Sequence, residues 1–429
     1  MINWVFFAIF SLLFVYIGYR SKKPLSSEEY FYSSYKLNAK ELFFTFSASW
    51  IGGATLILLS EKASKIGMLS LFIIPIPTII TLLLLFLLKE KIKGKSFFSM
   101  EELISKNYGR FFGTFSSFVF LWYLMLLGAS QLVALGKVGE SFLKTDYSVF
   151  VLISASFIIF YSSLRGLGAV VRTDKIQLYI IFFGILALLF FIIFKENSAP
   201  QLKISESSKF IFELLLMTLS FSLAWTVSPI SVQRIKATLN EKEIGKGLFF
   251  TAIFLSFFFL TIVYFGVRTG KGIVDFDYPS FLKDLVFLML LSALFSTYDT
   301  VLNSAAISFN YLTGVKGFYS TVFIGFFSII VALKIPNILK TLGLSSEIIA
   351  ESLFIPLIYL FVKGENQHTV KLGGWLVMIF GAFFSVFSFS SELFNLKVGL
   401  KWPSSLMYSL PLLFLIFMLS FFADRKKNE

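Results

Sequence analysis

Ala48-Ser49-Trp50-Ile51-Gly52-Gly53-Ala54-Thr55 lies in the middle of an apolar stretch that runs from residue 41 to residue 60. Inside a membrane every backbone N–H and C=O needs a partner, so adjacent glycines in mid-span predict a loosened helix that protein or water must support. Carbonyl oxygens freed at such a break can bind a small hard cation such as sodium. The alternative is a face of small residues for close helix packing, and the glycine pair alone leaves both interpretations open.

The composition around this stretch is that of a membrane protein. Of 429 residues, 57% are hydrophobic and only 15% are charged, and the mean hydropathy is +0.82. A soluble domain usually carries about 25% charged residues, so most of this apolar excess must face lipid or pack within a bundle. There is no cysteine and a single histidine, His368. Disulfides, thiolate metal sites and histidine-based catalysis are thereby excluded, and we expect no enzyme and no organic cofactor.

Apolar runs of about 20 residues, separated by short charged loops, predict thirteen transmembrane helices. We place them roughly at 3–19, 41–60, 67–88, 110–136, 147–164, 175–194, 208–233, 246–267, 282–309, 318–333, 345–362, 372–392 and 404–423.

The basic residues predict the orientation of these spans. Arg20, Lys22 and Lys23 follow the first span instead of preceding it, which argues against a cleavable signal peptide and predicts an N-terminus outside the cell. With the loops alternating from there, most of the Lys and Arg residues, Arg234 among them, fall on the cytoplasmic side. We therefore interpret the net charge of +13 as a topology signal and not as a nucleic-acid surface. The predicted location is the inner membrane, with a cytoplasmic C-terminus.

A second interruption is predicted in the seventh span, where Phe221-Ser222-Leu223-Ala224-Trp225-Thr226-Val227-Ser228-Pro229 contains a helix-kinking proline one turn after Trp225. The segments 41–195 and 208–363 have nearly equal length, contain five predicted spans each, and both open with an interrupted helix. This pattern is typical of the inverted repeats of secondary transporters. We expect residues 1–40 to add one helix and a cytoplasmic loop before the repeats, and residues 364–429 to add two helices and a short tail after them.

Polar residues within the spans indicate an ion site. Ser296, Asp299, Thr300 and Asn303 fall on one stripe of the ninth span. A carboxylate in mid-span costs about 2.5–3.5 kcal/mol, so this stripe should face water, a cation or another helix. An interhelical hydrogen-bond seam is the alternative to a cation site. Asp174 opens the sixth predicted span, where it is either a partner of the helix dipole or a functional carboxylate.

These segments together resemble the sodium:solute symporter family over nearly the whole chain. The resemblance rests on the order and spacing of five loose motifs: Glu28-Glu29-Tyr30-Phe31; Ala48 to Thr55; Tyr161-Ser162-Ser163-Leu164-Arg165-Gly166 with Thr173-Asp174-Lys175-Ile176-Gln177; Pro229-Ile230-Ser231-Val232-Gln233-Arg234; and Leu291-Ser292-Ala293-Leu294-Phe295-Ser296-Thr297. One departure is Trp50, which stands where relatives usually have a small polar residue, so the contacts to the solute are expected to differ.

The resemblance implies an all-α, leucine-transporter-like fold with a discontinuous first core helix and alternating access. It implies a sodium site formed by the carbonyls of Ala48, Ile51 and Ala293 and the hydroxyls of Ser296 and Thr297. It also places Asp174 on the inward release route, and Asp299 and Thr300 at the positions of a second sodium in some relatives. Expected solute and gate residues are Trp50, Thr55, Gln131, Trp225 and Ser228.

The expected function is sodium-coupled uptake of a small neutral or zwitterionic organic solute. Its partners would be that solute, sodium and membrane lipid, with no nucleic acid and no obligate protein partner. Two alternatives remain open at this stage: a proton-coupled symporter with Asp174 or Asp299 as carrier, and a sensor that binds solute without transporting it.

Overall fold

The computed structural model describes residues 2–20, 30–31, 37–194, 208–315, 317–363, 371–393 and 402–426, and nearly all of them are helical. His368, Glu28 and Glu29 lie outside the described residues. The elements, in chain order, are α1 Ile2–Arg20, α3 Ala39–Trp50, α4 Gly53–Ile66, the 3₁₀ helix η1 Gly67–Phe72, α5 Pro75–Gly94, α6 Met100–Tyr108, α7 Arg110–Val138, the π-helical turn η2 Gly139–Leu143, α8 Tyr147–Arg165, α9 Leu167–Phe194, α10 Ser208–Thr226, α11 Pro229–Ala237, α12 Glu241–Thr269, α13 Ser280–Thr313, α14 Gly317–Lys334, α15 Ile338–Ser352, α16 Phe354–Val362, α17 Lys371–Leu393 and α18 Leu406–Lys426.

The protein is a multi-pass membrane protein, but thirteen crossings are not confirmed. In the described part of the chain, eight helices are long and apolar enough to cross a membrane, or nine if the bent pair α15 and α16 is one span. Three shorter apolar segments lie within α1, α8 and α18. One reason for the lower count is that α4, η1 and α5 together form one candidate of 42 residues, Gly53–Gly94, whereas the 12-residue α3 is too short to qualify.

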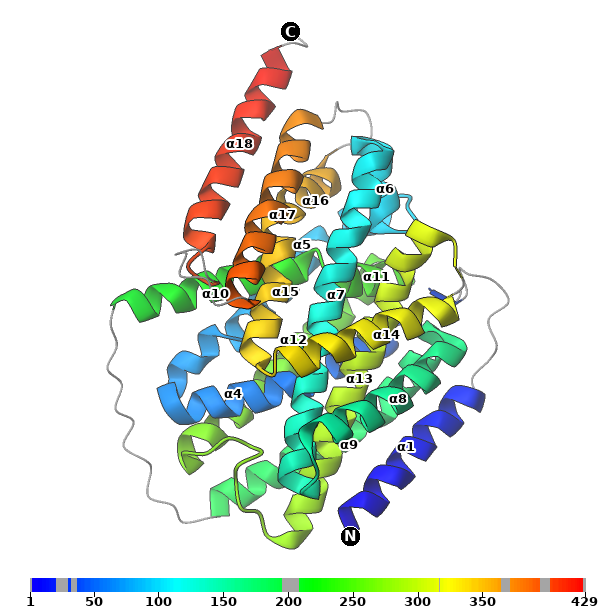
Figure 1. Ribbon diagram of the computed structural model, residues 1–429, viewed down its shortest axis with the longest axis vertical. Coiled ribbons are helices and arrows are strands. Elements are labelled where there is room, and N and C mark those ends of the chain that lie inside the picture. The colour runs from blue at the N-terminus through cyan, green and yellow to red at the C-terminus, as the bar shows by residue number, and fades with distance from the viewer. Residues whose placement is uncertain are drawn as a thin grey trace.

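Helices α7 and α13 form the centre of the bundle. In Figure 1, α7 runs through the middle of the molecule, whereas α1 and α18 lie at its two edges. The 34-residue α13 packs most extensively against α7 and α9. Its polar residues are therefore enclosed by other helices instead of lipid, as the cost of exposing them to hydrocarbon demands.

Both interruptions expected from the sequence are present. Helix α3 ends at Trp50 and α4 begins at Gly53, so the glycine pair stands at a true break. Helix α10 ends at Thr226 and α11 begins at Pro229, with Ser228 capping the new helix by accepting a hydrogen bond from the N–H of Ile230. Proline suits this first helical position because its missing N–H needs no partner there. The expected proline kink is thus a complete break.

A third break was not expected. The eleventh span begins at Ile338, seven residues before the predicted start, and bends by 52° between α15 and α16. No glycine pair marks this point, although Pro356 follows it by three residues. The repeat boundaries at 41–195 and 208–363 remain predictions.

Candidate ion and solute site

The break between α3 and α4 frees backbone groups next to α13. The regular helical bonds end with the N–H of Ile51 donating to Ser47 and resume with the N–H of Leu56 donating to Gly52. The carbonyls from Ala48 to Ile51 are therefore outside the helical ladder. One of them, that of Ser49, accepts a hydrogen bond of 3.0 Å from the hydroxyl of Thr297, which also donates to the carbonyl of Ala293 at 3.0 Å.

The glycines allow this contact because no side chain would fit between the two helices. A Cβ on Gly53 would lie 2.2 Å from Cγ of Leu294, and one on Gly52 would lie 3.3 Å from Oγ1 of Thr297. The freed N–H of Ala54 at the start of α4 donates to the side-chain oxygen of Gln131 at 3.3 Å. Close packing and backbone release, the two interpretations of the glycine pair, thus occur together.

The polar stripe of α13 is fully buried, and each member contacts a different neighbour. Ser296 donates to Asp174 of α9 at 2.6 Å. Asp299 accepts from Tyr161 of α8 at 2.7 Å, while its second carboxylate oxygen has no hydrogen-bond partner. Asn303 accepts from Gln233 of α11 at 3.0 Å. The stripe therefore joins α8, α9 and α11 to the break by interhelical hydrogen bonds, which was the alternative to a cation site. It also contains a carboxylate oxygen without a hydrogen-bond partner, on Asp299.

Asp174 does not stand at a helix N-terminus. Helix α9 begins at Leu167, earlier than the predicted start, so Asp174 lies about two turns inside it. The field of a helix dipole is confined to the first turn, and the dipole interpretation is therefore wrong. The buried carboxylate instead accepts two hydrogen bonds of 2.6 Å, from Thr45 of α3 and from Ser296 of α13.

The location predicted for Arg234 from the sequence is wrong. We expected it in a cytoplasmic loop, but it lies in α11 and is completely buried. Its guanidinium donates to the hydroxyls of Ser49 at 2.7 Å and Thr300 at 2.8 Å, and to that of Thr45 at 3.3 Å. Three hydroxyl side chains, two from α3 and one from α13, thus contact one buried cation.

A small cavity of about 60 Å³ lies beside the break, between α3, α7, α10 and α13. All five expected solute and gate residues line it, together with Tyr123 of α7 and Thr297; those five are Trp50, Thr55, Gln131, Trp225 and Ser228. Among the residues that the structure describes, no charged side chain lines this cavity. The volume accommodates only a few water molecules, so solute binding requires the walls to separate.

Aromatic rings form one wall of this cavity. The rings of Trp50 and Trp225 meet edge to face at 5.9 Å between centroids, and Phe46 and Phe221 extend the row on either side at 5.0 and 5.1 Å. Tyr123 donates from its hydroxyl to Ser228 at 3.1 Å, which ties α7 to the second break. The sequence did not single out Tyr123, because one tyrosine in an apolar span carries no distinguishing pattern.

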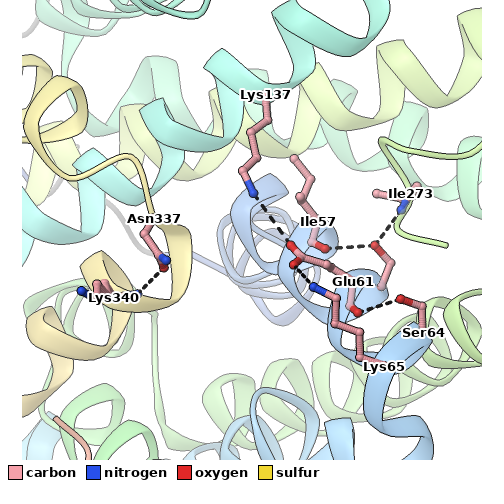
Figure 2. Close-up of polar contacts among 9 residues, drawn as sticks. Ile57, Glu61, Ser64, Lys65, Lys137, Ile273, Asn337 and Lys340 are labelled. Carbon is pink, nitrogen blue, oxygen red and sulfur yellow. Dashed lines mark hydrogen bonds and ion pairs between the residues drawn. The ribbon is translucent and has the colours of Figure 1, made fainter. Parts of the chain in front are cut away.

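A second, wider cavity of about 650 Å³ lies near the C-terminal end of α4. Charged residues of both signs line it, including Glu61, Lys137, Glu140, Asp275 and Lys283. Figure 2 shows Glu61 between Lys65, at 2.7 Å, and Lys137 of α7, at 3.8 Å. These ion pairs are partly exposed and contribute little to stability.

Comparisons with known proteins agree with this architecture. The fold is similar to that of a sodium-coupled sialic acid symporter in a substrate-bound, outward-open state, with a TM-score of 0.65 and 15% identity over 90% of this chain and 98% of that chain. It is similar also to a mutant manganese transporter of Eremococcus coleocola, with a TM-score of 0.51 and 13% identity over 90% and 92% of the two chains. The chain therefore has a leucine-transporter-like fold.

In sequence, the chain is 28% identical over 194 residues to high-affinity choline transporter 1 of Caenorhabditis elegans. This match spans 42% of the chain and 33% of that transporter. No family model matches the chain. The sequence match and the structural match together confirm the resemblance to the sodium:solute symporter family.

Proposed function

We propose that the chain is a secondary active transporter that takes up a small organic solute together with sodium. The observation that carries this proposal is the contact between the hydroxyl of Thr297 and the carbonyl of Ser49 at a helix break, 3.0 Å apart, within a leucine-transporter-like fold. Carbonyl and hydroxyl oxygens are the ligands that hard cations prefer. The sodium-coupled sialic acid symporter with a similar fold supports the choice of ion.

Sodium would bind the carbonyls of Ala48, Ile51 and Ala293 and the hydroxyls of Ser296 and Thr297. Three of these residues lie on α13 and two at the α3 break, so a bound ion would hold the two elements together. Ser296 is shared with Asp174, which gives the departing ion a carboxylate next to its site. A membrane potential of 100 mV contributes about 2.3 kcal/mol for each positive charge that enters, which drives accumulation of the solute.

The solute we propose is small and carries an ammonium group, either as a zwitterion or as a cation. The cavity presents the rings of Trp50, Trp225 and Tyr123, and none of the described residues that line it is charged. Aromatic faces attract quaternary ammonium groups, whereas a strongly anionic solute would need a basic partner. The sequence match to a choline transporter supports the same class. A zwitterion such as a betaine meets the expectation of a solute without net charge.

Uptake into proteoliposomes tests this function. Labelled choline, glycine betaine, proline and glucose are offered at fixed pH under a sodium gradient, or with sodium replaced by N-methyl-D-glucamine. We expect one of the two trimethylammonium compounds to accumulate only with sodium, and the Trp225→Ala variant to lose this uptake. Accumulation of glucose alone would overturn the solute class, accumulation of proline alone would keep the ammonium class but refute a trimethylammonium solute, and binding without accumulation would favour a sensor.

Proton coupling is the second candidate, because Asp174 and Asp299 are both buried beside the break. It predicts uptake that persists without sodium and follows an imposed pH gradient. The same proteoliposomes, with a pH gradient and no sodium, separate the two mechanisms.

A further inference from the structure

Three lysines from separate parts of the chain gather where α5, α11 and α16 end, and each donates to backbone carbonyls of the neighbouring segments. Lys93 of α5 donates to the carbonyl of Lys236 in α11, at 2.9 Å, and to that of Thr238. Lys236 donates to the carbonyl of Lys95 at 2.5 Å, and Lys95 donates to that of Lys363, the residue after α16, at 2.6 Å. We call Lys93, Lys95 and Lys236 the lysine cluster; all three are partly exposed.

The charge of this cluster is not neutralised by carboxylates. None of its lysines takes part in an ion pair within the described part of the chain, and α11 and α16 contain no acidic residue. The acidic residues of α5 and α6 have other partners. Glu90 pairs with Lys89 at 3.7 Å and Glu102 with Lys106 at 2.5 Å, while Glu101 is buried in a contact with α13. Each ammonium has three N–H donors, and the carbonyls take two of the first lysine and one of each of the others. Positive charge and donors therefore remain for an anion.

An apolar, outward-facing strip of α5 leads to the cluster. Ile79, Leu83 and Phe86 are 38, 57 and 40% exposed on the bundle. Ile79 and Phe86 precede Lys93 by four turns and two turns, so they share its face of the helix. The helix rises about 21 Å from Ile79 to Lys93, which exceeds the ~15 Å depth of one leaflet. Val362, 50% exposed, ends α16, which packs against α5. The surface thus has an apolar strip with a cationic end, the shape that an amphiphile with an anionic headgroup complements.

We propose that the lysine cluster binds the phosphate of an anionic phospholipid whose acyl chains lie along α5. Basic pockets between transmembrane helices suit such headgroups. A zwitterionic lipid brings its own ammonium group and leaves the lysines uncompensated, whereas free phosphate has no chain for the apolar strip. This surface lies apart from the candidate ion and solute site, and it depends on neither the coupling ion nor the solute.

A lipid in this position would contact the segment that joins the two broken helices. The carbonyls that Lys93 contacts lie at the end of α11. The same segment pairs with Leu37, just before α3, because Leu37 donates to Ala237 and accepts from Leu239, both at 2.9 Å. The bound headgroup should therefore stabilise the arrangement in which the ends of α3 and α11 are joined, and it should raise the melting temperature of the chain.

Native mass spectrometry of the purified full-length chain tests the proposal. The probes are phosphatidylglycerol, phosphatidylcholine with the same acyl chains, and soluble glycerol phosphate. We expect phosphatidylglycerol to bind about tenfold or more tightly than phosphatidylcholine, and glycerol phosphate not to compete with it at equal concentration. Each lysine beside an anionic headgroup contributes about fivefold in affinity, so Lys93→Gln with Lys236→Gln should weaken phosphatidylglycerol binding about 25-fold. Arginine at both positions keeps the charges and should preserve binding. The matched control, Lys209→Gln with Lys334→Gln, removes two exposed lysines elsewhere and should bind normally.

Three results would overturn the proposal. Equal affinity for the two lipids would show that the headgroup charge is not recognised. An equal loss in the control variant would show that general surface charge, and not the cluster, attracts the lipid. Glycerol phosphate binding as tightly as phosphatidylglycerol would show a site for a soluble anion. If the double glutamine variant does not fold, Lys95→Gln alone should weaken phosphatidylglycerol binding about fivefold, and unchanged affinity there would refute the role of the cluster.

Discussion

Replacing Gly53 with alanine should weaken sodium binding without touching any proposed sodium ligand. The added Cβ would lie 2.2 Å from Cγ of Leu294, and ordinary contact begins at 3.4 Å, so α4 and α13 must move apart by the difference. Cγ is a branch point close to the backbone, which leaves little room for a rotamer to relieve the overlap. Overpacking of this kind costs about 1–3 kcal/mol.

The strain should appear as a loss of ion affinity, because the proposed site needs oxygens from both sides of this contact. If about 1.4 kcal/mol of it falls on the sodium-bound form, the dissociation constant rises tenfold. Titration of the purified chain with radioactive sodium measures this change directly. We expect Gly53→Ala to bind sodium about tenfold or more weakly than the unmodified protein.

Two further variants show whether the effect is steric. Gly94→Ala adds the same methyl group where nothing lies within 4 Å, and it should bind sodium normally. Leu294→Ala removes the atom that clashes, so the double variant Gly53→Ala with Leu294→Ala should recover most of the lost affinity. Unchanged sodium affinity in Gly53→Ala would refute the claim that this helix contact positions the ion ligands.

Three more perturbations have defined outcomes. Thr297→Ala removes the hydroxyl that contacts Ser49 and should raise the sodium dissociation constant about tenfold, whereas Thr297→Ser should stay within about threefold in the same titration. Trp225→Phe should keep more ammonium-solute affinity than Trp225→Ala in competition binding, because a smaller aromatic face remains; equal affinities would argue against an aromatic contact. Glu101 of α6, outside the candidate spans, accepts a hydrogen bond from Ser308, and burial raises its pKa. Protonated Glu101 therefore stabilises the fold at low pH, and this stability is lost as the pH rises through the raised pKa. Glutamine does not titrate, so the melting temperature of Glu101→Gln should fall less between pH 5 and pH 8 than that of the unmodified protein. Equal changes in both proteins would show that Glu101 does not titrate in this range.

Much of the site could be predicted from the sequence because its signals are local. A glycine pair in an apolar run weakens a helix wherever that run lies in the fold, and the break appears at the predicted place. A carboxylate in mid-span must be enclosed, and Asp299 is enclosed. The expected solute and gate residues line one cavity because they surround the two breaks, and each break was recognisable within about ten residues of sequence.

The burial of Arg234 could not be predicted from local sequence patterns. A basic residue near the end of a predicted span matches the charge pattern of a cytoplasmic loop, and the sequence alone favours that interpretation. Its true environment depends on Ser49 and Thr300, which lie 185 and 66 residues away along the chain. The bend between α15 and α16, and the burial of Asp174 two turns inside α9, depend in the same way on neighbouring helices.

The amino-acid sequence by itself determined that the chain is a multi-pass membrane protein, where two of its helices break and which polar groups must be sheltered from lipid. Only the tertiary structure decided which of those groups face one another. The physical reason is that hydropathy and helix breaking act over one or two turns, whereas a hydrogen bond between buried helices joins residues whose separation in sequence carries no information about their distance.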